Sequence, residues 1–535
     1  MHAADSRNQP NSMNPHPTPP GVPGEGADAG VELMNNGDVK SLVQTASPRT
    51  PGPVRPGGSS KSRRTVLIIV GLVALLVIAK VTHIRSRIFP KPVAPAFPEQ
   101  GPPKPIHGPA DPEIRFEKIA LPGTDGIQFT AVVMGPDGQL YAGVNDGRIF
   151  RYPIHPDGTL DTPTIITSLQ KAENGKRLLI GICFDPSATA ENPVCWITHN
   201  YYAFREAPEW TSKVSKMSGK DLETVEDVVI NLPRSYNDHL TNQPNFGPDG
   251  ALYIPQGSNS SSGAPDDYWG DRPERLLDGS ILRLDITKLT PGQPLNVLTP
   301  DGGGNYDPYA RGAPLKIYAG GLRNAYDLVW ASDGRLYVPV NGAGAGGNVP
   351  AGDESEALHN LPNAEDDWLF RITPGKYYGH PNPQQHHYVL NGGNPDGVIR
   401  IGTVPEYKVG TQPDRDWEPA ILDIGVHCSA NGIIEYRGSA FHGKLDRHLM
   451  MCRYSGGSDI FSVELNSSGF VVGVQDKIPG LTDLGGPLDL VEDRHNGNIY
   501  VTEYGAKKIT LLRPLQGGSA ATRPVADSHS YVPGL

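Results

Sequence analysis

The chain has 535 residues and a formal net charge of −11. Its body carries no stripe of Lys and Arg, and an acidic chain of this kind is not built to neutralise phosphates, which argues against a nucleic-acid partner. The four cysteines show neither C-x-x-C nor C-x-x-C-H spacing, so a zinc site and an attached haem are both disfavoured.

Both ends of the chain differ in composition from its body. Residues 1–60 are rich in Pro, Gly, Asn and Ser with almost no apolar periodicity, and residues 516–535 are similar. Neither segment can bury enough apolar surface to offset its ordering entropy, so we predict that both are disordered. Between them we expect a Pro-rich linker over residues 83–112 and one folded body over residues 113–515.

An uncharged apolar run, TVLIIVGLVALLVIA, extends from Thr65 to Ala79 between basic flanks. A snorkelling Lys80 helps to lengthen it toward a membrane span of about 20 residues. We therefore predict a single transmembrane or signal-anchor helix over residues 65–82, with the large domain periplasmic or extracellular. The pair Arg63-Arg64 also resembles a twin-arginine export signal, so a cleaved signal is the alternative.

A signature of one turn and one strand repeats through the body of the chain. Its copies read GPDGQLYAG, GPDGALYIPQG, SDGRLYVPVNG and HNGNIYVTEYG, and degenerate copies within residues 178–203 and 431–465 bring the count to six. Units of this kind cannot bury both faces alone, and radial packing around an axis protects their edges. We therefore predict an all-β fold, a six-bladed β-propeller. A β-sandwich is the alternative, although it would not readily repeat the turn.

The most informative stretch is DHLTNQPNFGPDGALYIPQG, from Asp238 to Gly257. It places His239 eight residues before a GPDG turn, in which Pro presets φ, Asp bonds its downstream backbone and Gly takes the left-handed position. Long Gly-rich loops follow at residues 258–273 and 342–367. Loops of this length favour a binding role over simple connection.

Three further segments accompany that stretch in a fixed order: KIYAGGLRNAYDLVWASDGRLYVPVNG, DDWLFRITPGKYYGHPNP and HCSANGIIEYRGSAF. Together the four resemble the glucose/sorbosone dehydrogenase family, the soluble quinoprotein sugar dehydrogenases, and in particular its sorbosone-dehydrogenase-like branch. The resemblance covers roughly residues 116–514. It implies an oxidoreductase that oxidises an aldose or related sugar hydroxyl, with pyrroloquinoline quinone and calcium as cofactors and a separate electron acceptor.

The resemblance also assigns roles to single residues. His239 matches the family's general base, a task that suits histidine because its pKa lies near the operating pH. Arg323 and Asn324 match the residues that hold the quinone, where a guanidinium fork suits carboxylates or quinone oxygens. The ordinary alternatives are a loop histidine hydrated by water and an inter-blade salt bridge.

Neighbouring positions add further candidates. Arg453 is a candidate cofactor ligand, and Gln256 and His427 are candidates for the substrate pocket. The NGAG stretch offers backbone carbonyls of Gly342 and Ala343 as calcium ligands, since calcium prefers hard oxygen atoms.

The chain departs from the family pattern where cations are expected. Thr241 and Asn242 stand where members that bind the quinone well carry two glycines, Ser455 stands where they carry a lysine, and Gly486-Pro487-Leu488 replaces an Arg-x-Arg. Each charge-assisted hydrogen bond is worth about 1.5–3 kcal/mol, so three losses could weaken cofactor binding by several orders of magnitude. Two other functions therefore stay open: a cofactor-free propeller that binds carbohydrate or protein, and a metal-dependent lactonase.

Overall fold

The structure is a computed structural model that describes residues 107–108 and 110–515. The predicted disordered ends, the predicted helix over residues 65–82 and most of the predicted linker lie outside these residues. Within the part of the chain that is described, no helix is both long and apolar enough to cross a membrane.

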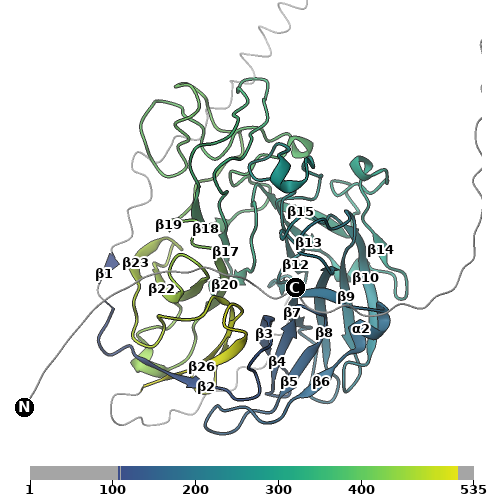
Figure 1. The fold of residues 1–535 in the computed structure, drawn as a ribbon, viewed down its shortest axis with the longest axis vertical. Helices are drawn as coiled ribbons and strands as arrows, with labels where there is room; N and C mark the ends of the chain where they lie inside the picture. Colours follow the sequence, from purple (N-terminus) through teal and green to yellow (C-terminus); the bar gives the residue numbers. More distant parts are fainter. Residues whose placement is uncertain (1–106, 109, 516–535) are drawn as a thin grey trace, which may run out of the picture. The chain divides into compact units, whose positions relative to one another are not determined.

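The described strands form six sheets, arranged as six blades (Figure 1). The first blade contains β3 (Phe129–Met134), β4 (Leu140–Val144), β5 (Ile149–Tyr152) and β6 (Thr164–Ile166). The second contains β7 (Arg177–Phe184), β8 (Val194–Tyr201), β9 (Ser212–Ser218), β10 (Thr224–Leu232) and β14 (Leu295–Asn296). The third contains β11 (Asn245–Phe246), β12 (Leu252–Gln256), β13 (Ser280–Leu284) and β15 (Leu315–Gly320).

The other three blades follow in chain order. The fourth contains β16 (Val329–Trp330), β17 (Leu336–Val340), β18 (Asp366–Ile372) and β19 (Leu422–Val426). The fifth contains β20 (Ala430–Glu435), β21 (Leu449–Arg453), β22 (Asp459–Leu465), β23 (Val471–Gln475) and β1 (His107–Gly108). The sixth contains β24 (Pro487–Asp493), β25 (Asn498–Glu503), β26 (Lys508–Pro514) and β2 (Phe116–Ala120). The predicted six-bladed propeller is confirmed.

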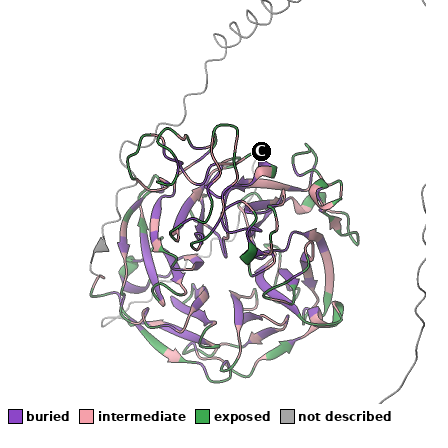
Figure 2. Cartoon of the chain, turned by 45° about the horizontal axis from the view of Figure 1, so that its top comes forward, coloured by how far each residue is buried: buried purple, intermediate pink, exposed green. Residues whose placement is uncertain are grey.

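Within residues 110–515, the helical segments are short and lie in the connections. They are α2 (Ser168–Ala172) and the 3-10 turns η1 (Asp267–Trp269), η2 (Ile286–Lys288), η3 (Pro300–Gly302), η4 (Pro383–Gln385) and η5 (Ala440–Gly443). Figure 2 shows that buried residues concentrate along the strands, whereas exposed residues gather in turns and outer loops.

The repeated turns join the first two strands of a blade. In the third blade, Asp249 accepts hydrogen bonds from the backbone N–H of Ala251 at 3.2 Å and from the Tyr253 hydroxyl at 3.1 Å. Gly250 has a φ of 75°, the left-handed conformation that the GPDG pattern predicts. The tyrosine of the LY pair is therefore buried for a reason: its hydroxyl is bound by the aspartate of its own turn.

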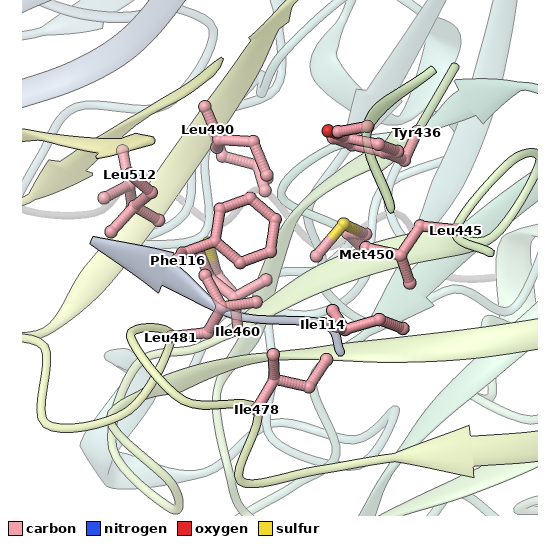
Figure 3. Close-up of a cluster of buried hydrophobic side chains, with 14 of the residues drawn as sticks. Ile114, Phe116, Tyr436, Leu445, Met450, Ile460, Ile478, Leu481, Leu490 and Leu512 are labelled. Atoms are coloured by element: carbon pink, nitrogen blue, oxygen red, sulfur yellow. The ribbon is translucent and has the colours of Figure 1, made fainter. Parts of the chain in front are cut away.

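The sixth blade is completed by a strand from the start of the folded body. Strand β2 pairs antiparallel with β26, from Phe116 opposite Pro514 to Ala120 opposite Thr510. Figure 3 shows Phe116 inside a cluster of apolar side chains from the fifth and sixth blades, which includes Leu490 and Leu512. The ring is thus closed both by a strand ladder and by apolar burial.

Side chains also connect the inner strands of neighbouring blades. The carboxylate of Asp489 accepts a hydrogen bond from the backbone N–H of Val132 at 2.7 Å, and Asp327 does the same for Ile433 at 3.0 Å. Burial raises the pKa of Asp489 to about 7. Burial and the nearby charge of Asp489 raise the pKa of Asp327 well above its ordinary value.

These raised values predict a stability that depends on pH. Because Asp489 holds its proton more tightly when folded, the free energy of unfolding should fall as pH rises from about 4 to about 7. Asp489→Asn should reduce this slope, and the slope should not vanish because Asp327 also contributes. Urea unfolding at a series of pH values measures it. The exposed control Asp161→Asn should keep the wild-type slope, and an unchanged slope in Asp489→Asn would contradict the assignment.

Candidate active site

Two equivalent loops position the predicted site residues. His239 lies between β10 and β11, and Arg323 and Asn324 lie between β15 and β16. Each loop leads from the outer part of one blade to the inner strand of the next. In an antiparallel blade these connections lie at the same end as the turns between the second and third strands, and we call this the site end. The site end therefore gathers residues from successive blades.

His239 is buried, with 4% of its surface exposed. Its Nδ1 lies 3.1 Å from the carbonyl oxygen of Ser258 and 3.0 Å from the Ser258 hydroxyl. Because a carbonyl can only accept, Nδ1 carries the proton and the lone pair of the neutral ring resides on Nε2. Burial and the positive charge of Arg323 lower the pKa of His239 well below 6.5, so the imidazole is neutral at ordinary pH.

Trp269, at the end of η1, covers this histidine. The ring centroids of Trp269 and His239 lie 4.0 Å apart. The Arg323 guanidinium lies 5.7 Å from the Trp269 ring centroid. Asp266 holds the loop in place by accepting the backbone N–H of Trp269 at 3.1 Å. The loop of residues 258–273 thus packs an aromatic ring against both predicted site residues.

Arg323 is buried, and its guanidinium donates hydrogen bonds to backbone carbonyls. Nε donates to Ser261 at 2.8 Å, and Nη1 donates to Gly342 at 2.8 Å and to Asn341 at 3.4 Å. Burial lowers the pKa of this guanidinium. The structure therefore places Arg323 as a clamp between two loops, where the resemblance implied a cofactor ligand.

Asn324 is also held by a hydrogen bond. Its Oδ1 accepts a hydrogen bond from Asn242 Nδ2 at 3.0 Å. A Cβ at Gly257 would lie 2.7 Å from the His239 Cβ and 3.0 Å from the Asn324 Oδ1, so only glycine allows this approach. The structure thus brings His239, Arg323 and Asn324 together.

Gln256 is fully buried beneath the same loops. Its Oε1 accepts the hydroxyl of Thr241 at 2.7 Å, and its Nε2 donates to the Pro233 carbonyl at 3.2 Å. The side chain expected in the substrate pocket is therefore used to tie the His239 loop to the end of β12.

The carbonyls expected to bind calcium face protein donors. The Gly342 carbonyl accepts from Arg323, and the Ala343 carbonyl accepts from the backbone N–H of Glu365 at 2.8 Å. The N–H of Gly342 in turn donates to Asp367 at 2.9 Å. These bonds hold the β17–β18 connection in a closed turn.

His427 lies between the fourth and fifth blades and Arg453 lies in the fifth blade, both at the site end. His427 is exposed and adopts a φ of 45° in the β19–β20 connection. Arg453, at the end of β21, forms a two-bonded ion pair with Asp459 at 2.8 and 2.6 Å and lies 4.8 Å from the Phe461 ring centroid. Arg453 is therefore tied to its own blade and is not aimed at the His239 loop.

Cavities at the two ends of the blades differ greatly in size. The cavity beside Arg323 measures about 10 Å³ and is lined by Asn341, Gly342, Glu365 and His380 among others. A cavity of about 610 Å³ lies at the opposite end, where Met134, His155 and Arg494 line it. None of the predicted site residues lines the larger cavity.

The residues present do not fit pyrroloquinoline quinone in the way that the resemblance implies. That cofactor carries three carboxylates, whereas Arg323 is bonded to carbonyls, Arg453 is bonded to a carboxylate, and the cavity that Arg323 lines accommodates about one water. Carboxylates also dominate nearby: burial and the charges of Asp423 and Asp367 raise the pKa of Asp366 to about 6. Calcium at Gly342 and Ala343 fits no better, because their carbonyls already accept hydrogen bonds.

One group of potential metal ligands occurs among the described residues, at Glu173, His199 and Asp227. The Lys213 ammonium donates to the carboxylates of Glu173 at 2.7 Å and Asp227 at 2.8 Å. The Arg177 guanidinium donates to the His199 ring at 3.0 Å. Cations of the protein thus already satisfy this group, and the lactonase alternative gains no open ligand set from it.

Sequence reasoning missed three residues of this region: Trp269, Glu274 and His380. Glu274 and His380 are buried and form a pair at 3.0 Å. The sequence offered two signals for these residues. One was the length of the 258–273 loop, which contains Trp269 and precedes Glu274, and the other was the YYGHPNP segment, which carries His380. Neither signal specifies a partner.

The clamp role of Arg323 predicts a loss of stability on truncation. Arg323→Ala should lower the free energy of unfolding by about 2–5 kcal/mol, because it removes charge-assisted bonds and leaves buried carbonyls unpaired. Denaturant unfolding measures the change. The matched control Arg148→Ala removes a partly exposed pair with Asp146 and should cost about 1 kcal/mol or less. Equal stability of the two variants would mean that Arg323 is not a clamp.

Comparison with known proteins places the fold in a family. Residues 128–512 match the family model described as Glucose / Sorbosone dehydrogenase. No curated protein sequence matches the chain.

Three solved structures illustrate the likeness. A presumed oxidoreductase (glucose dehydrogenase) from Thermus thermophilus is 19% identical, with a TM-score of 0.47 over 75% of this chain and 100% of that one. The PQQ domain of pyranose dehydrogenase from Coprinopsis cinerea is 11% identical, with a TM-score of 0.49 over 76% and 99%. The PQQ-bound aldose sugar dehydrogenase from Streptomyces coelicolor is 17% identical, with a TM-score of 0.44 over 75% and 99%.

Proposed function

Because the chain belongs to the glucose/sorbosone dehydrogenase family, we propose that it is an oxidoreductase that oxidises a hydroxyl group of an aldose or related sugar. The observation that carries the proposal is the meeting of His239, Arg323 and Asn324 from two successive blades. Family membership supplies the reaction class, and this meeting point supplies the groups that the reaction needs.

His239 is suited to accept the hydroxyl proton. Oxidation of an alcohol to a carbonyl releases the oxygen-bound proton and transfers the carbon-bound hydrogen as hydride to a two-electron acceptor, which a dye supplies in the assay below. A neutral imidazole with its lone pair on Nε2 can take that proton, and Ser258 keeps the ring in the required tautomer. The positive charge of Arg323, which acts on His239, also stabilises negative charge that develops on the substrate oxygen.

Access to His239 requires the 258–273 loop to move, because Trp269 covers the ring. Loops that close over a site in this way exclude water and are a common means of gating catalysis. The proposal therefore places substrate entry at the site end, between Trp269 and the β15–β16 loop.

The assay that tests this function uses the full-length protein in detergent. D-Glucose, D-galactose, D-mannose and D-xylose are offered with a dye acceptor, with and without added pyrroloquinoline quinone and Ca²⁺. His239→Ala should lower turnover by about 10²- to 10⁴-fold, the usual contribution of a general base. The control His155→Ala changes an exposed histidine at the opposite end and should keep wild-type turnover. Equal turnover of both variants would remove His239 from the mechanism.

A second candidate function is a cofactor-free propeller that binds carbohydrate at the site end. The engaged guanidinium groups of Arg323 and Arg453 favour it, since neither is directed at an anionic cofactor. Calorimetric binding of sugars without oxidation by any acceptor, quinone included, would select this function over the first.

We also propose that the protein is anchored by residues 65–82, on the basis of the apolar run in that segment, and that its propeller lies outside the cytoplasm. Full-length protein should sediment with membranes and be released by detergent, whereas a variant that lacks residues 65–82 should be recovered without detergent. Recovery of the intact full-length chain in the soluble fraction would argue against an anchor.

A further inference from the structure

A buried carboxylate and a buried imidazole meet at the site end. Glu274 belongs to the β12–β13 connection of the third blade. His380 belongs to residues 373–421, a long connection between β18 and β19 that returns to the third blade, where the His380 backbone N–H donates to the Gly321 carbonyl at 2.9 Å. The His380 Nε2 lies 3.0 Å from the Glu274 Oε1, and both side chains are almost fully buried. The pair thus joins two blades next to Arg323.

The donors around Glu274 fix the state of the histidine ring. The carboxylate accepts the backbone N–H groups of Asn259 at 3.0 Å and Ser260 at 2.9 Å, as well as the Ser260 hydroxyl. A carboxylate that collects this many donors is an acceptor only, so His380 Nε2 must carry the proton that bonds to it. In the neutral ring, the lone pair is then on Nδ1.

That lone pair has no partner inside the protein. The Nδ1 of His380 is buried and forms no hydrogen bond, and the same holds for the Oδ1 of Asn341. Both residues line the small cavity beside Arg323. Buried polar atoms without partners are rare in native proteins, and each needs an explanation. Two buried acceptors beside one small cavity suggest that a donor belongs there.

The size of the cavity limits what that donor can be. A volume of about 10 Å³ is close to what a single water-sized oxygen needs. An O–H group satisfies an acceptor, and its oxygen can accept from a guanidinium such as that of Arg323. The charges of Arg323 and Glu365, which both line the cavity, offset each other, so neither a cation nor an anion is favoured there. A single hydroxyl group matches the donor count, the volume and the charge.

We propose that His380, held by Glu274, forms with Asn341 a subsite for a second hydroxyl group of a carbohydrate, distinct from the hydroxyl that meets His239. This inference rests on the proposed sugar substrate. His380 is then a residue that determines specificity: a sugar with the hydroxyl satisfies the buried Nδ1, and a deoxy sugar leaves it unpaired. No bond is made or broken at this subsite.

The experiment compares sugars with their deoxy analogues. Calorimetry on the full-length protein without any electron acceptor first identifies the tightest binder among D-glucose, D-galactose, D-mannose and D-xylose, and then measures its monodeoxy derivatives. One derivative should bind about 10- to 100-fold more weakly, because a buried acceptor is left unpaired. If all derivatives bind like the parent sugar, or if none of the four sugars binds, the proposal is overturned and the cavity holds a water.

Variants of His380 assign the effect. His380→Gln keeps an amide donor for Glu274 and an acceptor for the cavity, so it should retain the discrimination. His380→Leu is similar in size and removes the acceptor, so it should bind the parent and the deoxy sugar within about twofold of each other. Discrimination that survives in His380→Leu would assign it to another residue and overturn the proposal.

A spectroscopic measurement covers the case in which His380→Leu does not fold. In protein labelled with ¹⁵N-histidine, the His380 ring is identified by the signals that disappear in His380→Gln. It should show a protonated Nε2 and a bare Nδ1, and the Nδ1 signal should shift when sugar is added. A protonated Nδ1, or no shift at saturating sugar, would overturn the subsite. The calorimetric and spectroscopic measurements need no turnover. They therefore still test the subsite if the protein binds sugars but does not oxidise them.

Discussion

The closed ring is the constraint on which everything else in this structure depends. A blade has an apolar face on each side that must be buried, and its edge strand presents unpaired N–H and C=O groups that can pair with another chain. Strand β2 closes the ring by pairing with β26, and Phe116 buries itself between the last two blades. Closure fixes the angle between successive blades, and that angle brings the loops before β11 and β16 to the same place.

Within this frame, Arg323 organises the site end. Its guanidinium bonds to carbonyls of the 258–273 loop and of the β17–β18 connection, two segments that the β-bridge between Ala264 and Asn348 also joins. Trp269 packs on His239 and also lies near this guanidinium. This cation therefore helps to hold the loop that covers the histidine, and burial together with this cation lowers the pKa of that histidine. Arg323 therefore affects both the position of the covering loop and the protonation of His239.

The sequence predicted the architecture better than it predicted the site. Six turn signals sufficed for six blades, because Asp249-Gly250 and its counterparts encode a local conformation that needs no distant partner. The family resemblance named His239 and Arg323, and the repeat spacing places both before an inner strand. It could not show that Arg453 binds Asp459, or that Gln256 is buried under Thr241. Those outcomes depend on side chains that compete for partners across the fold, and Glu274 and His380 meet from positions 106 residues apart.

The competition for partners also bears on cofactor binding. A tricarboxylate quinone at this site would have to take Arg323 from carbonyls that would then be buried without donors, at a cost of about 1–3 kcal/mol for each. The new charge-assisted bonds are worth about as much, so the exchange gains little from this residue. Net affinity would then need cations elsewhere, and the family's lysine and Arg-x-Arg positions hold Ser455 and Gly486-Pro487-Leu488. A sugar makes no such demand, because hydroxyl groups can donate to the buried acceptors of Asn341 and His380 while Arg323 keeps its clamp.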